Sequence, residues 1–167
     1  MAGKKRLYLL RHAKSSWDDP ALDDFARPLN KRGQRDAPFM GRRFREQGFA
    51  PDRIVSSPAE RAYETARAIA RELGCTLADI VRDEELYLAS PDTLLRCVHA
   101  TPDALGSVML IAHNPGLTDF ANALTGQHID NLPTCGLYCA DFSIRRWIDL
   151  TPGSGDFVCF DYPKKHR

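Results

Sequence analysis

The chain has 167 residues, of which 43% are hydrophobic and 27% are charged, and its formal net charge is +1 at pH 7. These values are typical of one globular domain, which we expect to span residues 1–167, and a nearly neutral chain indicates no nucleic-acid partner. The basic start MAGKKR precedes an apolar run too short for a signal peptide or a membrane span, so we expect a cytoplasmic protein without a membrane partner.

The first predicted elements are a strand and a helix. The apolar run at residues 7–10 is typical of a buried strand. After a polar loop, Asn30 is expected to cap a helix that ends at Gly48. Pro38 lies inside this pattern, so the helix is expected to be kinked or to begin late. Its buried face should carry the residues that share one side of the helix, Ala37, Met40, Gly41 and Phe44.

A second strand is predicted at residues 53–57, and the strongest helix start of the sequence follows it. Ser57, Pro58 and Glu60 supply an N-cap, a proline at the first helical position and a capping-box acid. We expect this helix to end at Gly74. Its apolar stripe consists of Ala62, Ala66, Ile69, Ala70 and Leu73.

A further helix and strand follow in the second half of the chain. Ser90 and Pro91 are typical of a helix start, and the residues expected to face inward are Leu94, Leu95 and Val98. Residues 107–112 predict a third strand. Asn114 is then expected to cap a helix that runs to about Gly126.

Two late apolar stretches complete the pattern. Residues 137–142 and 157–162 have no predicted helix between them, and we interpret both as edge strands. The alternation of strands and helices before them predicts an α/β domain, a three-layer α/β/α sandwich with a mostly parallel central sheet.

Basic side chains follow three of the predicted strands. Arg11 and His12 come after the first strand, Arg61 lies early in the helix after the second, and His113 follows the third. Because parallel strands end at one edge of a sheet, we expect these four side chains to reach one pocket. Each residue taken singly is more often structural, so the prediction depends on their joint placement.

Two guanidinium groups and nearby helix N-termini predict an anionic ligand, most naturally a phosphoryl group. A neutral imidazole can accept a phosphoryl group while arginines and a protonated second histidine stabilise its oxygens. The chain has neither a P-loop nor a GxGxxG motif, so a nucleotide cradle is not what assembles this charge, and no cofactor is expected. No metal is expected either, because the arginines would repel a cation and the five cysteines contain no CxxC pair. The cysteines are interpreted as small buried thiols.

Four segments, RHAKSSW, RPLNKRG, SSPAERAYETA and IAHNPGL, in this order resemble the histidine phosphatase superfamily, and specifically its SixA-type phosphohistidine phosphatases. The resemblance implies a phosphoglycerate mutase-like fold and a reaction without a metal. It implies that His12 accepts the phosphoryl group and that Arg11 and Arg61 clamp the phosphate. It further implies that His113 hydrogen-bonds the phosphoryl group and that Arg27, in the RPLN segment, lies at the pocket rim and contributes to substrate binding.

The chain departs from the broader superfamily in two respects. Ala13 replaces the usual glycine after the motif histidine, as in SixA-like members. Superfamily members that hydrolyse phosphate monoesters use a carboxylic acid to protonate the leaving alkoxide, which SixA-like members are thought to lack. Here Asp83, Glu84 and Glu85 form either a solvated acidic turn, which we favour, or the source of such an acid. Imidazole leaves from a P–N bond more readily than an alkoxide leaves from an ester, so it needs less help from an acid.

The sequence therefore predicts a phosphatase that acts on a phosphohistidine-bearing protein, such as a histidine phosphotransfer domain, through a covalent phospho-His12 intermediate. The alternative is a phosphatase of small phosphorylated molecules, namely phosphate monoesters, with Glu84 or Glu85 as the general acid. A mutase is less favoured, because the chain offers little material for a lid that would exclude water. A catalytically silent phosphate-binding module is a further alternative, although all four pocket residues are present.

Overall fold

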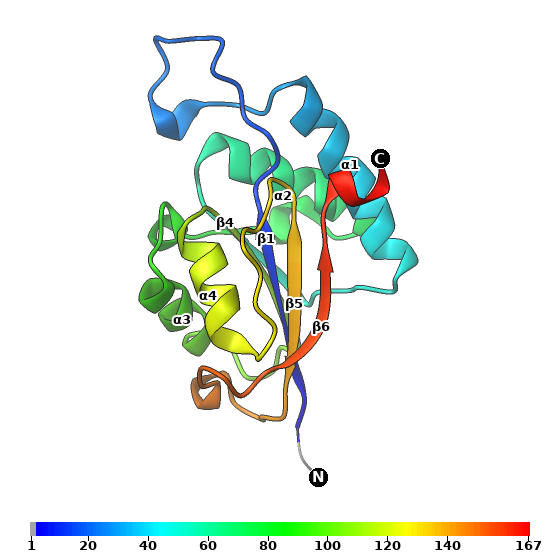
Figure 1. Cartoon of the computed structure of the whole chain (residues 1–167), viewed down its shortest axis with the longest axis vertical. Helices are drawn as coiled ribbons and strands as arrows, with labels where there is room; N and C mark the ends of the chain where they lie inside the picture. Colours follow the sequence, from blue (N-terminus) through cyan, green and yellow to red (C-terminus); the bar gives the residue numbers. More distant parts are fainter. Residues whose placement is uncertain (1–2) are drawn as a thin grey trace.

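The computed structural model describes residues 3–167, and a six-stranded sheet with the order β3-β2-β4-β1-β5-β6 forms its centre (Figure 1). The strands are β1 (Lys5–Arg11), β2 (Arg53–Ser56), β3 (Val81–Arg82), β4 (Ser107–Ala112), β5 (Leu137–Phe142) and β6 (Asp156–Asp161). β1 to β4 pair in parallel, whereas β5 runs antiparallel to both β1 and β6. The predicted α/β fold with a mostly parallel sheet is confirmed.

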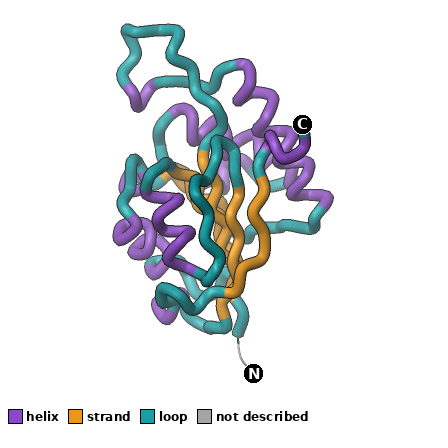
Figure 2. The backbone as a smooth tube through the Cα atoms, in the orientation of Figure 1, coloured by secondary structure: helices purple, strands orange, loops and turns teal. Residues whose placement is uncertain are grey.

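Helices cover both faces of the sheet (Figure 2). They are α1 (Lys31–Glu46), α2 (Glu60–Leu73), α3 (Pro91–His99) and α4 (Gly116–Leu124). Alternate residues of β1 point to opposite layers: Leu7 and Leu9 join the core under α3 and α4, while Tyr8 and Leu10 join the core under α1 and α2. A strand buried on both faces therefore reads as a continuous apolar run. Over residues 3–167, none of the helices has the length and apolarity that crossing a membrane requires.

α1 begins where its cap predicts. The Asn30 side chain accepts a hydrogen bond from the backbone N–H of Gly33 at 2.9 Å, and the four apolar residues of the predicted face are buried. The helix starts at Lys31 and continues through Pro38, so the expectation of a late start is wrong. Gly48 follows the last turn with a φ of 76°, a left-handed conformation that glycine adopts at little cost.

α2 begins later than its sequence signature predicts. Its first residue is Glu60, and the capping position is held by Ala59, which makes no side-chain cap. The predicted cap at Ser57 is therefore wrong. Its hydroxyl oxygen lies 2.7 Å from Nε2 of His113, and the backbone nitrogen of Ala59 donates to it over a longer distance of 3.3 Å. The predicted end at Gly74 is confirmed, with a φ of 73°.

α3 and α4 follow their predicted signals with one change in length. Ser90 caps α3 by accepting from the N–H of Thr93, as predicted. α4 is shorter than predicted and ends at Leu124. Asn114 lies two residues before it, yet its side chain accepts from both the N–H and the hydroxyl of Thr118 at 3.1 and 2.9 Å. The capping bond is thus present although the helix starts late.

The interpretation of residues 137–142 as an edge strand is wrong. β5 pairs with β1 on one side and with β6 on the other, and all six of its residues are buried. The buried Asp141 is accommodated because Arg6 binds its carboxylate through two nitrogens, at 2.7 and 3.0 Å. β6 and β3 are the edges of the sheet. The five cysteines are free thiols, of which Cys135 and Cys139 are buried and the others half-buried.

Candidate active site

Three of the predicted site residues meet at the carboxyl ends of the parallel strands. Arg11 and Ala112 are paired residues of β1 and β4, and each is followed by a histidine. This level register places the rings of His12 and His113 with their centroids 5.2 Å apart. Arg61 reaches them from the first turn of α2, which follows β2. The predicted convergence of these side chains is therefore observed.

Arg61 bridges the two histidines. Its Nε donates to Nε2 of His12 at 3.4 Å, and its Nη2 lies 3.3 Å from Nδ1 of His113. All three side chains are buried. A guanidinium held between two imidazoles concentrates positive charge in a space that little water enters, which favours an anion there.

Hydrogen bonds define which ring nitrogens carry protons. Nδ1 of His12 lies 2.7 Å from the carbonyl oxygen of Ala13, which can only accept, so Nδ1 carries the proton and Nε2 keeps its lone pair. His113 is reversed: its Nδ1 accepts from Arg61, so Nε2 carries the proton towards the Ser57 hydroxyl. Each ring therefore directs one unprotonated nitrogen at Arg61, Nε2 of His12 and Nδ1 of His113.

Both histidines are neutral in the free protein. Burial lowers the pKa of His12 to about 3 against the opposing effect of the Ala13 carbonyl, and the charges on Arg61 and Arg11 act in the same direction as burial. Burial, followed by the charge on Arg61, also lowers the pKa of His113 to about 3. The expected protonated second histidine is thus not the state of the free site. A bound dianion would have to supply the negative charge that draws a proton onto His113.

Arg11 lies beside the histidines at the end of β1. Its Nη1 donates to the carbonyl oxygen of Leu132 at 3.2 Å, while its buried Nε has no hydrogen-bond partner among the described residues. Burial lowers the pKa of Arg11, and the nearby charge on Arg61 lowers it further. Two guanidinium groups close enough to repel each other, one with a buried donor unpaired, are suited to share an anion.

Arg27 is buried rather than exposed at a rim, and it is not in contact with either histidine. Its guanidinium donates to the Ser15 hydroxyl at 2.6 Å and to the Asp24 carboxylate at 3.1 Å. The exposed ring of Trp17 covers it, with the guanidinium carbon 3.5 Å from the ring centroid. Arg27 is therefore linked to Arg61 through the Asp24 carboxylate, and its charge also contributes to the lowered pKa of His113.

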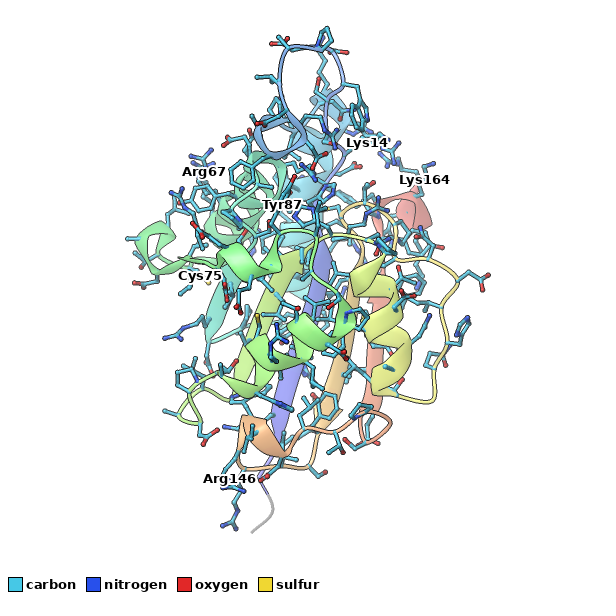
Figure 3. The ribbon with its side chains drawn as sticks, turned by 90° about the vertical axis from the view of Figure 1, so that its left-hand side faces the viewer. Lys14, Arg67, Cys75, Tyr87, Arg146 and Lys164 are labelled. Atoms are coloured by element: carbon cyan, nitrogen blue, oxygen red, sulfur yellow. The ribbon has the colours of Figure 1, made fainter. Side chains whose placement is uncertain are left out.

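Asp24 and Tyr87 are two site residues that the sequence reasoning missed. Oδ2 of Asp24 accepts from Arg61 at 3.0 Å and from the Tyr87 hydroxyl at 2.6 Å. The Tyr87 ring stands edge-on to His113 with centroids 5.5 Å apart. Figure 3 shows Tyr87 at the end of the sheet opposite to Arg146. The available signal for Asp24 was its position three residues before Arg27, in a loop that looks like an acidic surface turn.

Asp24 is ionised. Burial alone would raise its pKa, but the hydrogen bond from Tyr87 and the interactions with Arg61 outweigh this and lower the pKa to about 2. Burial and the hydrogen bond to this carboxylate raise the pKa of Tyr87. Asp24 can therefore orient the cations, but it holds no proton to donate near neutral pH.

The acidic turn before Tyr87 lies at the margin of the site. Glu84 and Glu85 are exposed, and the Glu85 carboxylate lies within 4.8 Å of the ligand atoms of Asp83 and Cys97. Over residues 3–167, no hydrogen bond or ion pair links either glutamate to the four predicted catalytic residues. The turn nonetheless leads directly to Tyr87, whose backbone N–H donates to the carbonyl oxygen of Glu84.

Comparisons with known proteins agree with this geometry. The family model "Histidine phosphatase superfamily (branch 1)" matches residues 7–87. An uncharacterized chloroplast protein of Arabidopsis thaliana is 35% identical over 140 residues, which cover 78% of this chain but only 63% of the plant protein, less than two thirds of its length. An uncharacterized protein of Mycobacterium leprae is 31% identical over 167 residues, with 93% of this chain and 100% of that protein covered.

Solved structures show the same relationship. A protein of Agrobacterium tumefaciens assigned as the phosphohistidine phosphatase SixA is 32% identical, with a TM-score of 0.82 over 95% of this chain and 98% of that chain. The protein histidine phosphatase SixA complexed with tungstate is 21% identical, with a TM-score of 0.82 over 97% of this chain and 99% of that chain. The latter likeness concerns the fold alone.

Proposed function

The chain belongs to the histidine phosphatase superfamily and shares the fold of the SixA structures. From this premise we propose that it is a phosphatase that removes the phosphoryl group from a phosphohistidine on another protein. The observation that carries the proposal is the pair formed by His12 and Asp24. His12 presents an unprotonated Nε2 beside Arg61, whereas the carboxylate that contacts Arg61 is ionised. Such a site supports a nucleophile without a strong general acid.

In the proposed reaction, the Nε2 lone pair of His12 attacks phosphorus as the P–N bond to the substrate imidazole breaks. The phosphoryl group enters between His12 and Arg61, whose Nε releases the ring nitrogen and binds an equatorial oxygen together with Arg11. Solvent protonates the other ring nitrogen of the substrate phosphohistidine before the P–N bond breaks, so the group that leaves with the electrons of that bond is neutral imidazole. A water molecule then attacks the phosphorus of phospho-His12, which regenerates the histidine and releases inorganic phosphate.

The leaving group explains why an ionised carboxylate is compatible with catalysis. Imidazole is a much weaker base than an alkoxide, so expulsion from phosphorus needs little proton transfer in the transition state. Asp24, with a pKa of about 2, would be a poor acid for an ester but a suitable counter-ion for Arg61. The site therefore fits a P–N bond better than a P–O bond.

The second candidate is a phosphatase of small phosphate monoesters with Glu84 or Glu85 as the general acid. Two observations favour it. Glu84 begins the 3-10 turn (Glu84–Leu86) that leads to Tyr87 in the site. The mycobacterial glucosyl-3-phosphoglycerate phosphatase shares the fold, with a TM-score of 0.66 at 15% identity over 92% of this chain and 97% of that one.

The deciding experiment compares two substrate classes. Release of radiolabelled phosphate from phosphohistidine-bearing phosphotransfer domains is measured against turnover of a panel of small monoesters, for the wild type and His12→Ala. Fast dephosphorylation of protein, lost in His12→Ala, with weak ester activity is expected. Strong ester turnover with an inert phosphoprotein, lost in Glu84→Gln or Glu85→Gln, would establish the second candidate. A label trapped on a residue other than His12 would contradict the proposed intermediate.

A further inference from the structure

Exposed apolar side chains lie in the loop between β1 and α1 and directly after Tyr87. Trp17, Leu22, Phe25 and Leu88 are 71%, 38%, 42% and 57% exposed, and we call these four residues the apolar patch. Three of them lie in the loop between β1 and α1, which projects beyond the end of the sheet in Figure 1. The large hydrophobic residues that are exposed elsewhere over residues 3–167 are Val81, Ile148 and Phe157.

Two members of the apolar patch touch residues of the site. The Trp17 ring stacks on Arg27 at 3.5 Å, and Arg27 binds the Asp24 carboxylate. The Phe25 ring lies edge-on to Tyr87, with centroids 5.1 Å apart, and Tyr87 contacts both Asp24 and His113. The Tyr87 side chain thus lies between Phe25 and His113. Trp17 is connected to Arg61 through two side chains, those of Arg27 and Asp24.

The conformation of Leu88 points to a role outside the core. Its φ of 52° is one that a leucine adopts only at a cost, and the side chain that results is exposed rather than packed. It directly follows Tyr87, the residue whose ring contacts Phe25. A strained, exposed leucine adds nothing to the buried core. An exposed apolar side chain of this kind is suited to contact with a binding partner.

We propose that the apolar patch is the docking surface for the phosphorylated protein, and that it binds an apolar surface flanked by basic side chains next to the phosphohistidine. This inference rests on the proposed function. A small phosphorylated molecule needs only the arginines and histidines, whereas a folded protein that delivers a histidine to His12 must also lie against the loops around it.

Charge indicates the chemistry of the partner. Asp18, Asp19 and Asp23 are exposed in the same loop as Trp17 and Phe25. Carboxylates beside an apolar patch attract lysine and arginine and repel acidic surfaces, including anionic membranes. The partner surface is therefore expected to present apolar side chains with positive charges at their edge.

The test separates docking from chemistry by using two substrates. The double variant Leu22→Ser with Leu88→Asn removes apolar surface, and asparagine tolerates a positive φ. For this variant, kcat/KM towards phosphohistidine-bearing phosphotransfer domains is expected to fall about tenfold or more through KM. Its kcat/KM towards the small substrate N-phosphoimidazole should match the wild type. Ile148→Ser, which removes a similarly exposed side chain (54%) outside the apolar patch, should affect neither substrate.

Asp18→Asn with Asp19→Asn provides an independent measure. This variant should weaken the dependence of kcat/KM on salt for the phosphoprotein and leave that of N-phosphoimidazole as it was. An equal loss on both substrates in the Leu22→Ser and Leu88→Asn variant, or no loss on either, would overturn the docking surface alone. A wild type that turns over N-phosphoimidazole but none of the phosphoproteins would instead contradict the proposed function, and the docking surface with it.

Discussion

Asp24 holds Arg61 through two separate acceptors. Its Oδ2 accepts from Nη2 at 3.0 Å and its backbone carbonyl oxygen accepts from Nη1 at 2.6 Å. This pair fixes the guanidinium plane while Nε remains directed at His12. Asp24 therefore orients the cation that meets the phosphoryl group in the proposed reaction, although it carries the same sign of charge as the proposed substrate.

The Asp24→Asn variant tests this orienting role. Asparagine keeps an oxygen acceptor but loses the charge-assisted bond, so kcat/KM is expected to fall about tenfold, and further in Asp24→Ala. Tyr87→Phe, which removes only the hydroxyl that donates to Asp24, should have a smaller effect. The measurement is steady-state kinetics together with inhibition by tungstate. Tighter tungstate binding in Asp24→Asn would mean that the carboxylate competes with the anion instead of orienting Arg61.

Arg61→Lys is expected to be a severe change although it keeps the charge. The guanidinium donates in three directions at once, to His12, to His113 and to Asp24, which a single ammonium cannot reproduce. We expect kcat/KM to fall on the order of 100-fold, with most of the loss in kcat, because the bonds to equatorial oxygens tighten in the transition state. Single-turnover phosphoryl transfer to His12 measures this directly. Near-normal transfer in the lysine variant would show that charge alone suffices.

Three residues of the candidate site could be predicted because their positions follow from strand order. His12, Arg61 and His113 each follow a parallel strand, and parallel strands deliver their ends to one edge. Asp24 could not be found in this way. It meets Tyr87 across 63 residues, from a loop without periodicity and a short 3-10 turn, so nothing local connects them. Long-range contacts of this kind depend on tertiary packing rather than on sequence pattern.

Two errors about the fold have similarly specific causes. Ser57 carries the signature of a helix cap, but a hydroxyl that accepts from a backbone N–H can equally accept from an imidazole, and His113 is the closer partner. The sequence predicts residues 137–142 at an edge because no helix lies between them and residues 157–162. The position of β5 inside the sheet depends on an antiparallel pairing with β1, which the connection between β5 and β6 does not reveal.

Stability should decrease in mild acid because His12 and His113 are buried in their neutral form. Each has a folded-state pKa of about 3, below the ordinary value of 6.5, so the unfolded chain binds more protons between these values. The stabilisation is fully present above pH 6.5 and is lost as the pH falls towards 3. Between pH 7 and pH 5, each histidine should lower the free energy of unfolding by about 2 kcal/mol.

Denaturant unfolding at pH 7 and pH 5 measures this loss. His113→Asn should be less stable than the wild type at pH 7, yet should lose less stability on acidification, because one buried titrating group has gone. His128→Asn is the matched control, because the His128 side chain is 74% exposed and its replacement removes no buried imidazole. An identical pH dependence in the wild type and His113→Asn would show that this ring is not buried as a neutral group.

Gly33 is the residue whose replacement should connect packing to catalysis. It lies in the first turn of α1, and an added Cβ would meet the carbonyl oxygen of Lys14 at 2.2 Å. That carbonyl belongs to the segment after His12 and also accepts from the N–H of Asn30 at 3.0 Å. Because both partners are backbone, neither can rotate away. Gly33→Ala must therefore shift α1 or the segment that carries His12.

Helix propensity alone predicts the opposite result, since alanine stabilises a helix interior by about 0.5–1 kcal/mol relative to glycine. We expect the clash to dominate, with a net loss of about 1–3 kcal/mol in unfolding free energy and a reduced kcat. Gly126→Ala is the control, because nothing lies within 4 Å of its added Cβ. Thermal unfolding and phosphatase assays on both variants measure the effect. A Gly33→Ala protein as stable and active as Gly126→Ala would contradict this prediction. It would mean that the segment after His12 can move without loss of stability or activity.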